Sequence, residues 1–339
     1  MKQSVSLCMI VRDEEANLAG CLEGVAGLFD EVIVVDTGSI DGTRQVAARF
    51  GAKVFDFPWI DDFAAARNES RRHATGQWIF WLDADDRVDA INRGRLAELL
   101  ENLPEVNDQR NPIFSAWCKC SLPDFSDADL AVKHGRLFPN RPDLAWTGRI
   151  HERIMPAPGA AAVEMVQTDV TIYHSGYADT QERARKIQRN ARLIEREYLL
   201  DPDDALTLYY LARQRMWQGR YSESIHLAKR SVENDPSDML STTPHCFVMA
   251  ADCEFKLKRL EKAVELTRQG LDRFPENLAI IYQRGCFLSD LKQMREAAAC
   301  LARVIDAGRE KLALAGMHAE TQLPIAHMTL GNIHRAEKK

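Results

Sequence analysis

The chain has 339 residues, of which 45% are hydrophobic and 28% charged, so it can bury a sizeable core and has room for two domains. Its 44 basic and 50 acidic residues give a net charge of −6, which excludes a general electrostatic attraction to nucleic acid or to an anionic membrane. Any recognition of phosphate must therefore be local.

The first residues, MKQSVSLCMIVRDEE, contain an apolar stretch too short for a signal peptide, and far short of the roughly 20 residues of a membrane-spanning helix. Among eight cysteines only Cys118 and Cys120 lie close together, at a spacing that fits neither a zinc site nor a redox motif. We therefore expect reduced core thiols in a cytoplasmic protein without a transmembrane segment.

Short β-rich runs alternate with helical patterns up to about residue 90. Strands are predicted at SVSLCMIV, EVIVVD, AKVFDF and WIFWLD, and helices at residues 17–28, 43–50 and 63–74. This alternation indicates βαβ units and an α/β fold, Rossmann-like, with a mostly parallel sheet covered by helices on both faces. The central strands are apolar throughout, as such a sheet requires.

The pattern changes twice farther along the chain. Residues 96–173 are rich in turns, with antiparallel strands predicted at FSAWCKC, GRLFP and VTIYH, and beyond Gly176 the pattern is wholly helical. We expect an α/β domain over residues 1–177, a connecting helix over 178–200 and an all-α repeat domain over 201–339.

The helical part contains an internal repeat. Residues 205–236, 245–275 and 278–305 align on themselves without gaps, with small residues at Ala212, Ala251 and Gly285 where two helices must cross closely. The offsets of about 39 and about 34 residues resemble those of tetratricopeptide repeats.

The repeats are degenerate, because the turn glycine of the first unit, Gly219, becomes Lys258 and Lys292 in the later ones. Residues 325–335 are similar to the opening helix of a truncated fourth unit that could cap the stack.

The strand WIFWLDADD, residues 78–86, ends in three carboxylates, Asp83, Asp85 and Asp86. Paired carboxylates at the open end of a buried strand build a hard-oxygen site for a divalent cation, and a cation there can hold a diphosphate. Capping of a following helix is the alternative for Asp83 and Asp85. Asp86 is expected to lie at the surface.

The strand EVIVVD ends at Asp36, before the turn TGSIDGT. A carboxylate at this place lies in the crevice where open α/β sheets bind ligands, and it could accept the N–H of a nucleobase. The turn lacks the GxGxxG pattern of dinucleotide sites. A polar turn with Asp41 near a helix start is the alternative.

The first strand leads into charged residues beside the same edge. Backbone atoms near Val11, the charge of Arg12 and the side chain of Glu14 could frame the ribose or the base. A solvated helix start with acidic residues in its first turn explains them equally well.

Four motifs follow one another in a characteristic order: VRDEEANL after the first strand, the turn DTGSIDGT, the pair Arg67 and Asn68, and the strand end LDADD. This order resembles the family 2 glycosyltransferases, whose nucleotide-sugar domain has the GT-A fold. The resemblance covers residues 4–90 and extends loosely over residues 130–175. The later stretch, with GRLFPNRPDLAWTGRIHERI and IYHSGY, is most similar to the sublancin-type peptide S-glycosyltransferases, some of which also carry helical repeats.

The resemblance implies that Asp36 contacts the base, that Arg67 assists at the nucleotide, and that Asp83 and Asp85 form the DxD pair. Asp85 would coordinate the metal, Mn²⁺ or Mg²⁺, while Asp83 would contact the ribose or the water shell of the metal. The late position of His174 in the GT-A fold implies a further metal ligand, and imidazole is acceptable to manganese. A structural histidine is the alternative.

An inverting transfer needs a base that deprotonates the acceptor. We expect Glu152 in WTGRIHERI to be this base, with Trp146 and His151 in a loop that contacts the sugar or the acceptor. A surface ion pair with Arg149 or Arg153 is the alternative for Glu152. Asp143 and Asp124 are the backup candidates.

The sequence thus predicts an inverting glycosyltransferase that uses a nucleoside-diphosphate sugar, with UDP expected, and a divalent metal. The groove of the repeats suits an extended peptide or protein acceptor, and a saccharide or lipid-linked acceptor of cell-envelope assembly is the competing expectation. A repeat-based binding protein with an inactive transferase domain remains an alternative. So does a phosphatase of the haloacid dehalogenase type, although Arg87 replaces the Thr or Val expected after its DxD.

Overall fold

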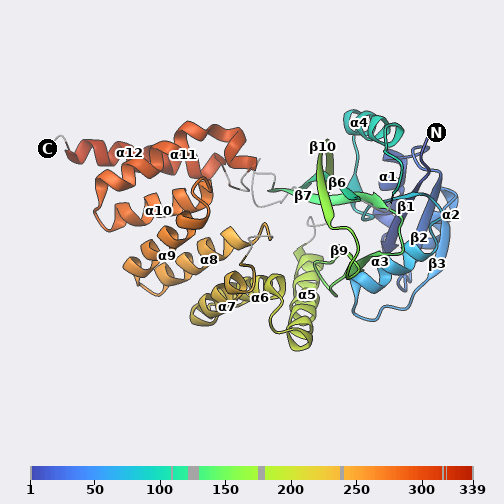
Figure 1. Cartoon of the computed structure of the whole chain (residues 1–339), viewed down its shortest axis with the longest axis horizontal. Helices are drawn as coiled ribbons and strands as arrows, with labels where there is room; N and C mark the ends of the chain where they lie inside the picture. The colour runs from blue at the N-terminus through green and yellow to red at the C-terminus, as the bar shows by residue number, and fades with distance from the viewer. Residues whose placement is uncertain are drawn as a thin grey trace. The chain divides into compact units, whose positions relative to one another are not determined.

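The computed structural model of the chain describes residues 2–107, 110–120, 130–174, 180–236, 240–314, 317 and 319–337. The chain divides into two compact units, Met1–Lys186 and Ile187–Lys339, and each is described by itself. Figure 1 labels their helices and strands. Within the described residues, no helix combines the length and the apolar character needed to cross a membrane.

The first unit has an α/β fold, as predicted. Its strands are β1 (Val5–Val11), β2 (Glu31–Asp36), β3 (Lys53–Asp56), β4 (Trp78–Trp81), β5 (Asp86–Arg87), β6 (Asn111–Cys120), β7 (Leu130–Pro139), β8 (Leu144–Thr147), β9 (Arg153–Pro156) and β10 (Val163–His174). Its helices are α1 (Glu15–Gly24), α2 (Thr43–Arg49), α3 (Phe63–Arg72) and α4 (Ala90–Glu101). The strands and helices predicted for the first 90 residues are confirmed within a few residues at their ends.

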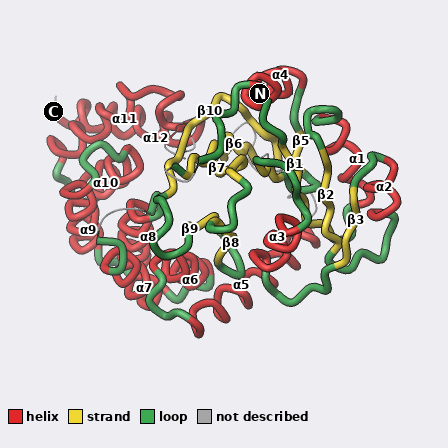
Figure 2. The backbone as a smooth tube through the Cα atoms, turned by 45° about the vertical axis from the view of Figure 1, so that its right-hand side comes forward, coloured by secondary structure: helices red, strands yellow, loops and turns green. Residues whose placement is uncertain are grey.

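Eight strands form one mixed sheet in the order β3-β2-β1-β4-β7-β6-β10-β5. The first four are mutually parallel, and β1, β2 and β3 lie side by side in Figure 2. β7 runs antiparallel to both β4 and β6. The expectation that β10 is antiparallel is only partly right, because β10 pairs parallel with β6 and antiparallel with β5. The segments between β6 and β10 return the chain to the end where β6 begins, and this return makes a parallel pair possible.

Both faces of the sheet are covered, which explains the apolar central strands. On one face, a core cluster joins strand residues such as Leu7 and Phe80 to Leu18 of α1, Val46 of α2 and Leu96 of α4. On the other face, a second cluster joins Ile33 and Ile79 to Ala64 of α3 and to Trp146 and Ile154 of the hairpin β8–β9. The sheet is therefore held rigid between two apolar layers.

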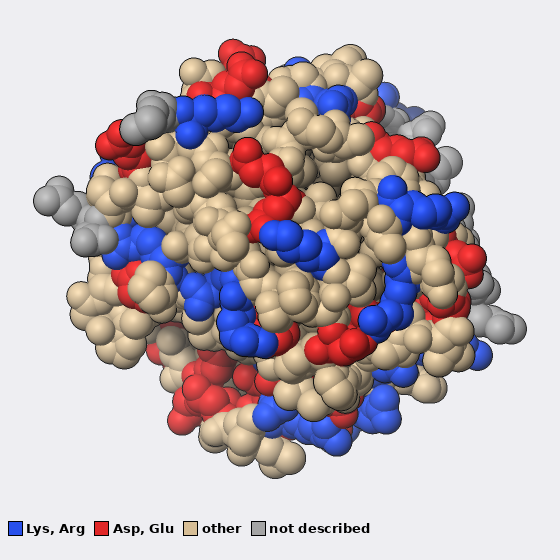
Figure 3. Space-filling model, turned by 90° about the vertical axis from the view of Figure 1, so that its right-hand side faces the viewer, with Lys and Arg blue, Asp and Glu red and all other residues tan. Residues whose placement is uncertain are grey.

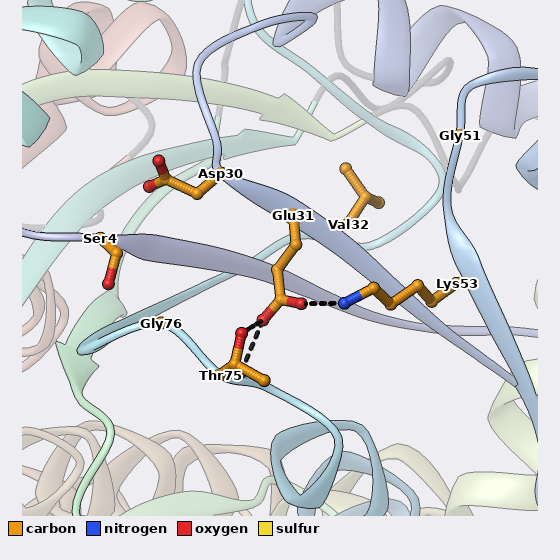
Figure 4. Close-up of a pocket in the computed structure, with 8 residues that line it drawn as sticks. All are labelled: Ser4, Asp30, Glu31, Val32, Gly51, Lys53, Thr75 and Gly76. Atoms are coloured by element: carbon orange, nitrogen blue, oxygen red, sulfur yellow. Dashed lines mark hydrogen bonds and ion pairs between the residues drawn. The ribbon is translucent and has the colours of Figure 1, made fainter.

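A cavity of about 300 Å³ lies at the amino ends of the parallel strands (Figure 4). Glu31 dominates it, accepting hydrogen bonds from Lys53 Nζ at 2.7 Å, Ser6 Oγ at 2.6 Å and the backbone N–H of Thr75 at 2.6 Å. Asp30 likewise accepts from the N–H of Val5 at 2.7 Å. These carboxylates are already engaged within the protein, and the cavity lies at the sheet edge opposite to the usual ligand crevice. We therefore interpret it as a structural feature and not as a ligand site.

The second unit is helical. Helix α5 (Thr180–Leu200) spans the division between the units, and α6 (Ala205–Trp217), α7 (Tyr221–Glu233), α8 (Thr243–Lys256), α9 (Leu260–Arg273), α10 (Leu278–Asp290), α11 (Met294–Leu314) and α12 (Ala319–Glu337) follow. The three predicted helix pairs and the helix of a fourth unit are confirmed. The limits 1–177, 178–200 and 201–339 stay predictions.

The same backbone turn joins the two helices of each repeat. Gly219, Lys258 and Lys292 have φ angles of 74°, 62° and 64°, in the left-handed region that favours glycine. The lysines thus adopt the conformation of the glycine that they replace. At the helix crossing of the third repeat, a Cβ on Gly285 would lie 2.9 Å from the Leu301 side chain, which explains the small residue there.

Candidate active site

The carboxyl ends of the parallel strands meet at one edge of the sheet. β1 ends at Val11, which is in register with Asp36 at the end of β2, and β4 ends at Trp81, just before the DxD sequence. The crevice outside this edge is where open α/β sheets bind ligands. On the face of the molecule drawn in Figure 3, basic and acidic residues are interspersed.

Four residues form a compact acidic cluster at this edge. One potential ligand atom from each of Asp83, Asp85, Asp86 and His174 lies within 4.8 Å of the others. The three aspartates follow β4, whereas His174 ends β10 and pairs with Asp86 in the β10–β5 register. Sheet pairing thus brings together residues that are 88 positions apart.

Asp85 is buried beside two cations. Its Oδ1 lies 3.3 Å from His174 Nδ1, and its Oδ2 lies 3.7 Å from Lys186 Nζ. Burial and the neighbouring carboxylates raise the pKa of Asp85, against the attraction of His174 and Lys186. Lys186 was missed by the sequence reasoning, because nothing in a charged helix distinguishes one lysine from its neighbours.

The same carboxylates act on the pKa of His174. Burial lowers its pKa, but the hydrogen bond to Asp86 and the charges of the carboxylates outweigh burial and raise the pKa to about 9. His174, Asp83 and Asp85 were all predicted as site residues, and the structure brings them together. Carboxylate oxygens with one imidazole are a donor set that suits Mn²⁺ or Mg²⁺.

The prediction that Asp86 lies at the surface is wrong. Asp86 is completely buried and forms an ion pair with Arg136 of β7, Oδ2 to Nη1, at 2.8 Å. The reason is the short strand β5, which pairs with β10 and turns the Asp86 side chain inward. Arg136 was not predicted either, because its strand also contains Lys133 and His134 and nothing in the sequence distinguishes Arg136 from them.

Arg67 of α3 joins the acidic cluster to Glu152. Its Nε lies 2.5 Å from Glu152 Oε1, its Nη2 lies 3.0 Å from Asp83 Oδ1, and its guanidinium stacks 4.1 Å from the centre of a Trp81 ring. Burial opposes the charge of Arg67, but the two carboxylates outweigh burial and raise its pKa. Conversely, burial opposes the charge of Asp83, while Arg67 and Arg136 lower its pKa.

Glu152 thus pairs with the buried Arg67, and the alternative of a surface ion pair for Glu152 is wrong. Arg149, one of the partners considered, lies 3.6 Å from Asp62. The backup candidate Asp143 is paired with Arg141 at 2.8 Å, and Asp124 lies outside the described residues.

The β8–β9 hairpin is fixed to α3 by Asn68, the residue next to Arg67. The Asn68 side chain donates to the carbonyl of Trp146 at 2.8 Å and accepts from its N–H at 2.9 Å. The Trp146 indole is buried and packs edge-on against Trp81 at 5.4 Å. Trp146 thus lies in the core rather than in an open loop, while His151 lies in the hairpin turn with a φ of 54°.

Asp36 is buried at the end of β2 and organises the following turn. Its Oδ1 accepts from the N–H groups of Gly38 at 3.0 Å and Ser39 at 2.8 Å, and its Oδ2 lies 3.3 Å from Arg44 Nη1. The predicted contact to a nucleobase would have to share Oδ2 with Arg44.

The loops after β1 and β2 are bonded to each other. Ser39 Oγ accepts from the N–H of Asp13 at 2.9 Å, and the Asp13 carboxylate accepts from the N–H of Ile40 at 2.8 Å. The N–H of Glu14 donates to Thr43 Oγ1 at 2.8 Å. These bonds fix the backbone of Glu14, and Val11 lies in register with Asp36. The Arg12 side chain is exposed.

Comparison with known proteins identifies this arrangement. A family model described as glycosyl transferase family 2 matches residues 6–141. The uncharacterized glycosyltransferase RT0209 of Rickettsia typhi is 33% identical over 213 residues, which cover 56% of this chain and 72% of that protein. The chain belongs to the family 2 glycosyltransferases. The predicted family is thus confirmed, and the phosphatase alternative falls.

Two further relatives bear on the predicted subgroup and on the repeats. The glycosyltransferase SunS of Bacillus subtilis strain 168 is 26% identical over 242 residues, covering 68% of this chain and 54% of that protein. A TPR repeat-containing protein of Synechococcus elongatus, Synpcc7942_0270, is 35% identical over 209 residues, covering 59% of this chain and 49% of that protein. The chain spans about half the length of these two relatives. The helix pairs at the carboxy-terminal end of this chain resemble tetratricopeptide repeats, as predicted.

Proposed function

We propose that this family 2 glycosyltransferase moves a sugar from a nucleoside-diphosphate sugar, with UDP as the expected nucleotide, to a peptide or protein acceptor with inversion. The observation that carries the proposal is the meeting of Asp83, Asp85 and His174 with Arg67 and Glu152 at the carboxyl edge of the parallel strands. Each group matches a need of the transfer: a cation site, a positive charge and a base.

Asp85 and His174 would hold a divalent cation, and Asp83 would contact the ribose or the water around the cation. When bound, such a cation neutralises the charge that develops on the departing diphosphate. The fit rests on the donor set itself, carboxylates and an imidazole within 4.8 Å of one another.

Glu152 is the proposed base. Arg67 holds its Oε1, and we assign Oε2 to take the proton from the acceptor. As the acceptor atom bonds to the anomeric carbon, its proton passes to Glu152, and the bond from the anomeric carbon to the diphosphate oxygen breaks with its electron pair leaving on that oxygen. Attack from the face opposite to the leaving group gives inversion. His151, in the same turn, is the proposed contact to the sugar or the acceptor. The core packing of Trp146 supports a role in placing this turn.

Asp36 Oδ2 is the proposed partner of a base N–H, with Val11, Arg12 and Glu14 around the nucleoside. The mutual bonding of the two loops supports this assignment, because it gives the nucleoside a preformed edge. The peptide or protein acceptor is proposed from the repeats, whose stacked helices form a concave groove in proteins of this type. A saccharide acceptor is the competing outcome.

The test is a hydrolysis screen of UDP-, GDP- and TDP-sugars with Mn²⁺ and without acceptor. We expect slow release of one nucleoside diphosphate. Asp85→Ala should abolish both release and Mn²⁺-dependent thermal protection by that diphosphate, whereas Glu152→Gln should keep the protection and lower turnover by at least about 100-fold. A flat thermal response to all three diphosphates would point to an inactive domain that carries a binding module.

Two more variants separate the roles. Asp36→Ala should weaken nucleotide binding while the dependence on Mn²⁺ stays. His174→Ala should raise the Mn²⁺ concentration required for half-maximal protection. Near-normal rates for Glu152→Gln would show that the base is another residue.

A further inference from the structure

The contacts of Asp86 engage both oxygens of its carboxylate. Oδ2 accepts from Arg136 Nη1 at 2.8 Å and from the backbone N–H of Asp83 at 2.9 Å. Oδ1 lies 3.0 Å from His174 Nδ1. One carboxylate thus joins strand β7, the DxD segment and the end of β10.

The cation that balances Asp86 is as deeply buried as Asp86 itself. Arg136 has an exposed fraction of 2% and Asp86 of 0%. The guanidinium stacks 3.8 Å from the centre of a Trp81 ring, which fixes its plane. A buried ion pair is a weak source of stability, because both charges lose their hydration. This pair therefore needs an explanation beyond stability.

Direct coordination of a metal by Asp86 would not explain the pair. A cation bound to Oδ2 would compete with Arg136 and would leave a buried guanidinium without its carboxylate, which is strongly unfavourable. Asp85 differs, because its ion-pair distances to His174 and Lys186 are longer, at 3.3 and 3.7 Å.

The contact to His174 suggests the purpose. When Nδ1 of an imidazole donates to a carboxylate, the proton stays on Nδ1 and the lone pair of Nε2 becomes the one that can coordinate a cation. Asp85 Oδ1 also lies near Nδ1, at 3.3 Å, but Asp86 Oδ1 is the closer acceptor and belongs to the more deeply buried side chain.

We propose that Asp86 and Arg136 are a positioning pair for the cation site: Arg136 holds Asp86, and Asp86 fixes the ring of His174 as an Nε2 ligand while anchoring the backbone of Asp83. This inference rests on the metal site of the proposed function. In this proposal neither Asp86 nor Arg136 coordinates the cation.

The test is Mn²⁺ binding, measured by electron paramagnetic resonance without any nucleotide. Asp86→Asn keeps the shape of the side chain, but it removes the charge and puts a donor where an acceptor is needed. We expect the affinity for Mn²⁺ to fall by about 10- to 100-fold, as for other residues that orient metal ligands. Arg136→Lys should retain part of the affinity that Arg136→Met loses.

The matched control is Glu31→Gln. Glu31 is another mostly buried carboxylate with several donors, but it lies at the opposite edge of the sheet. Glu31→Gln should lower the melting temperature and leave the Mn²⁺ affinity within about 2-fold of the wild type. A purely structural role of Asp86 predicts that both variants behave alike.

A second measurement needs no variant to fold. In the wild-type protein loaded with Zn²⁺ as a diamagnetic probe, the ring ¹⁵N shifts of His174 should show a protonated Nδ1 and a coordinated Nε2. Unchanged Mn²⁺ affinity in Asp86→Asn, or a proton on Nε2, would overturn the inference and leave the proposed function intact. A wild type that binds no Mn²⁺ would instead contradict the metal site of the proposed function, and the inference with it.

Discussion

Arg67 is the residue on which both halves of the candidate site depend. It is buried beneath Trp81 and reaches Asp83 with one nitrogen and Glu152 with another. A lysine has a single compact charge and cannot bridge two carboxylates with the rigid geometry of a guanidinium. Removal of the charge would leave the mostly buried Glu152 and the partly buried Asp83 without their shared partner.

We therefore expect Arg67→Met to lower the free energy of unfolding by about 3 to 5 kcal/mol and Arg67→Lys by less. Urea denaturation measures both values. The control is Arg72→Met on the same helix, whose exposed side chain pairs with Glu69, and its effect should stay below about 1 kcal/mol. Equal losses for Arg67→Met and Arg72→Met would contradict this account of Arg67.

Glu31 makes the stability of the α/β unit depend on acid. Burial raises the pKa of Glu31, but hydrogen bonds from Lys53, Ser6 and Thr75 outweigh burial and lower the pKa from 4.5 to about 2. The stabilisation is thus complete above about pH 4.5 and is lost as the pH falls toward 2. We expect up to about 3 kcal/mol of pH-dependent stability in this range that Glu31→Gln lacks. Urea denaturation from pH 5 to 2.5 measures it, and parallel curves for the two proteins would refute the assignment.

At the scale of elements, the β8–β9 hairpin depends on one side chain of α3. Asn68 bonds both backbone groups of Trp146, and the following turn carries Glu152. Without this clamp, the proposed base Glu152 should lose its position. The cation site should be less affected, since its ligands come from the ends of β4 and β10.

Asn68→Ala should therefore destabilise the unit by about 1 to 3 kcal/mol, because it leaves buried backbone groups unsatisfied. Turnover should fall while the Mn²⁺ affinity stays within about 2-fold of the wild type. Kinetics and Mn²⁺ titration on the same preparation provide the comparison. Equal losses in both would show that the hairpin and the cation site are not separable.

The repeat turns offer a second prediction at this scale. A left-handed conformation costs a residue with a side chain about 1 kcal/mol more than glycine, partly offset by the greater freedom of glycine in the unfolded chain. Lys258→Gly and Lys292→Gly should each stabilise the helical unit by about 0.5 to 1 kcal/mol, and Gly219→Ala should destabilise it by a similar amount. Thermal unfolding followed by circular dichroism tests the sign, which should be opposite in the two kinds of variant.

At the scale of the whole molecule, the proposed nucleotide site belongs to one of the two compact units. We expect two calorimetric transitions. Mn²⁺ with the matching nucleoside diphosphate, at 100 times the Kd, should stabilise the α/β unit by about 2.7 kcal/mol and leave the helical unit unchanged. Gly285→Ala, which brings a Cβ against Leu301, should lower the melting temperature of the helical unit alone. This shift shows which of the two transitions belongs to the helical unit. One transition that shifts as a whole would show that the units unfold together.

Local patterns in the sequence determined the parts of this protein. The alternation of apolar runs predicted the first four strands and their helices, the DxD residues were placed at a strand end, and the recurring small residues predicted the helix pairs, because each of these signals lies within a short segment. Arg67, His174 and the DxD roles of Asp83 and Asp85 came instead from the resemblance to a family, and Glu152 from the composition of its loop. The roles of these residues stay predictions.

Only the tertiary structure decided how these parts meet. The pairing of β10 with β5 buries Asp86 and brings His174 to the cluster, β7 supplies Arg136, and Arg67 lies 85 positions from the carboxylate with which it pairs. The sequence likewise did not predict that β10 runs parallel to β6. The physical reason is the same in each case: strand order and register depend on how distant segments pack, and a periodic pattern specifies which side of a strand is apolar but not which strand lies beside it.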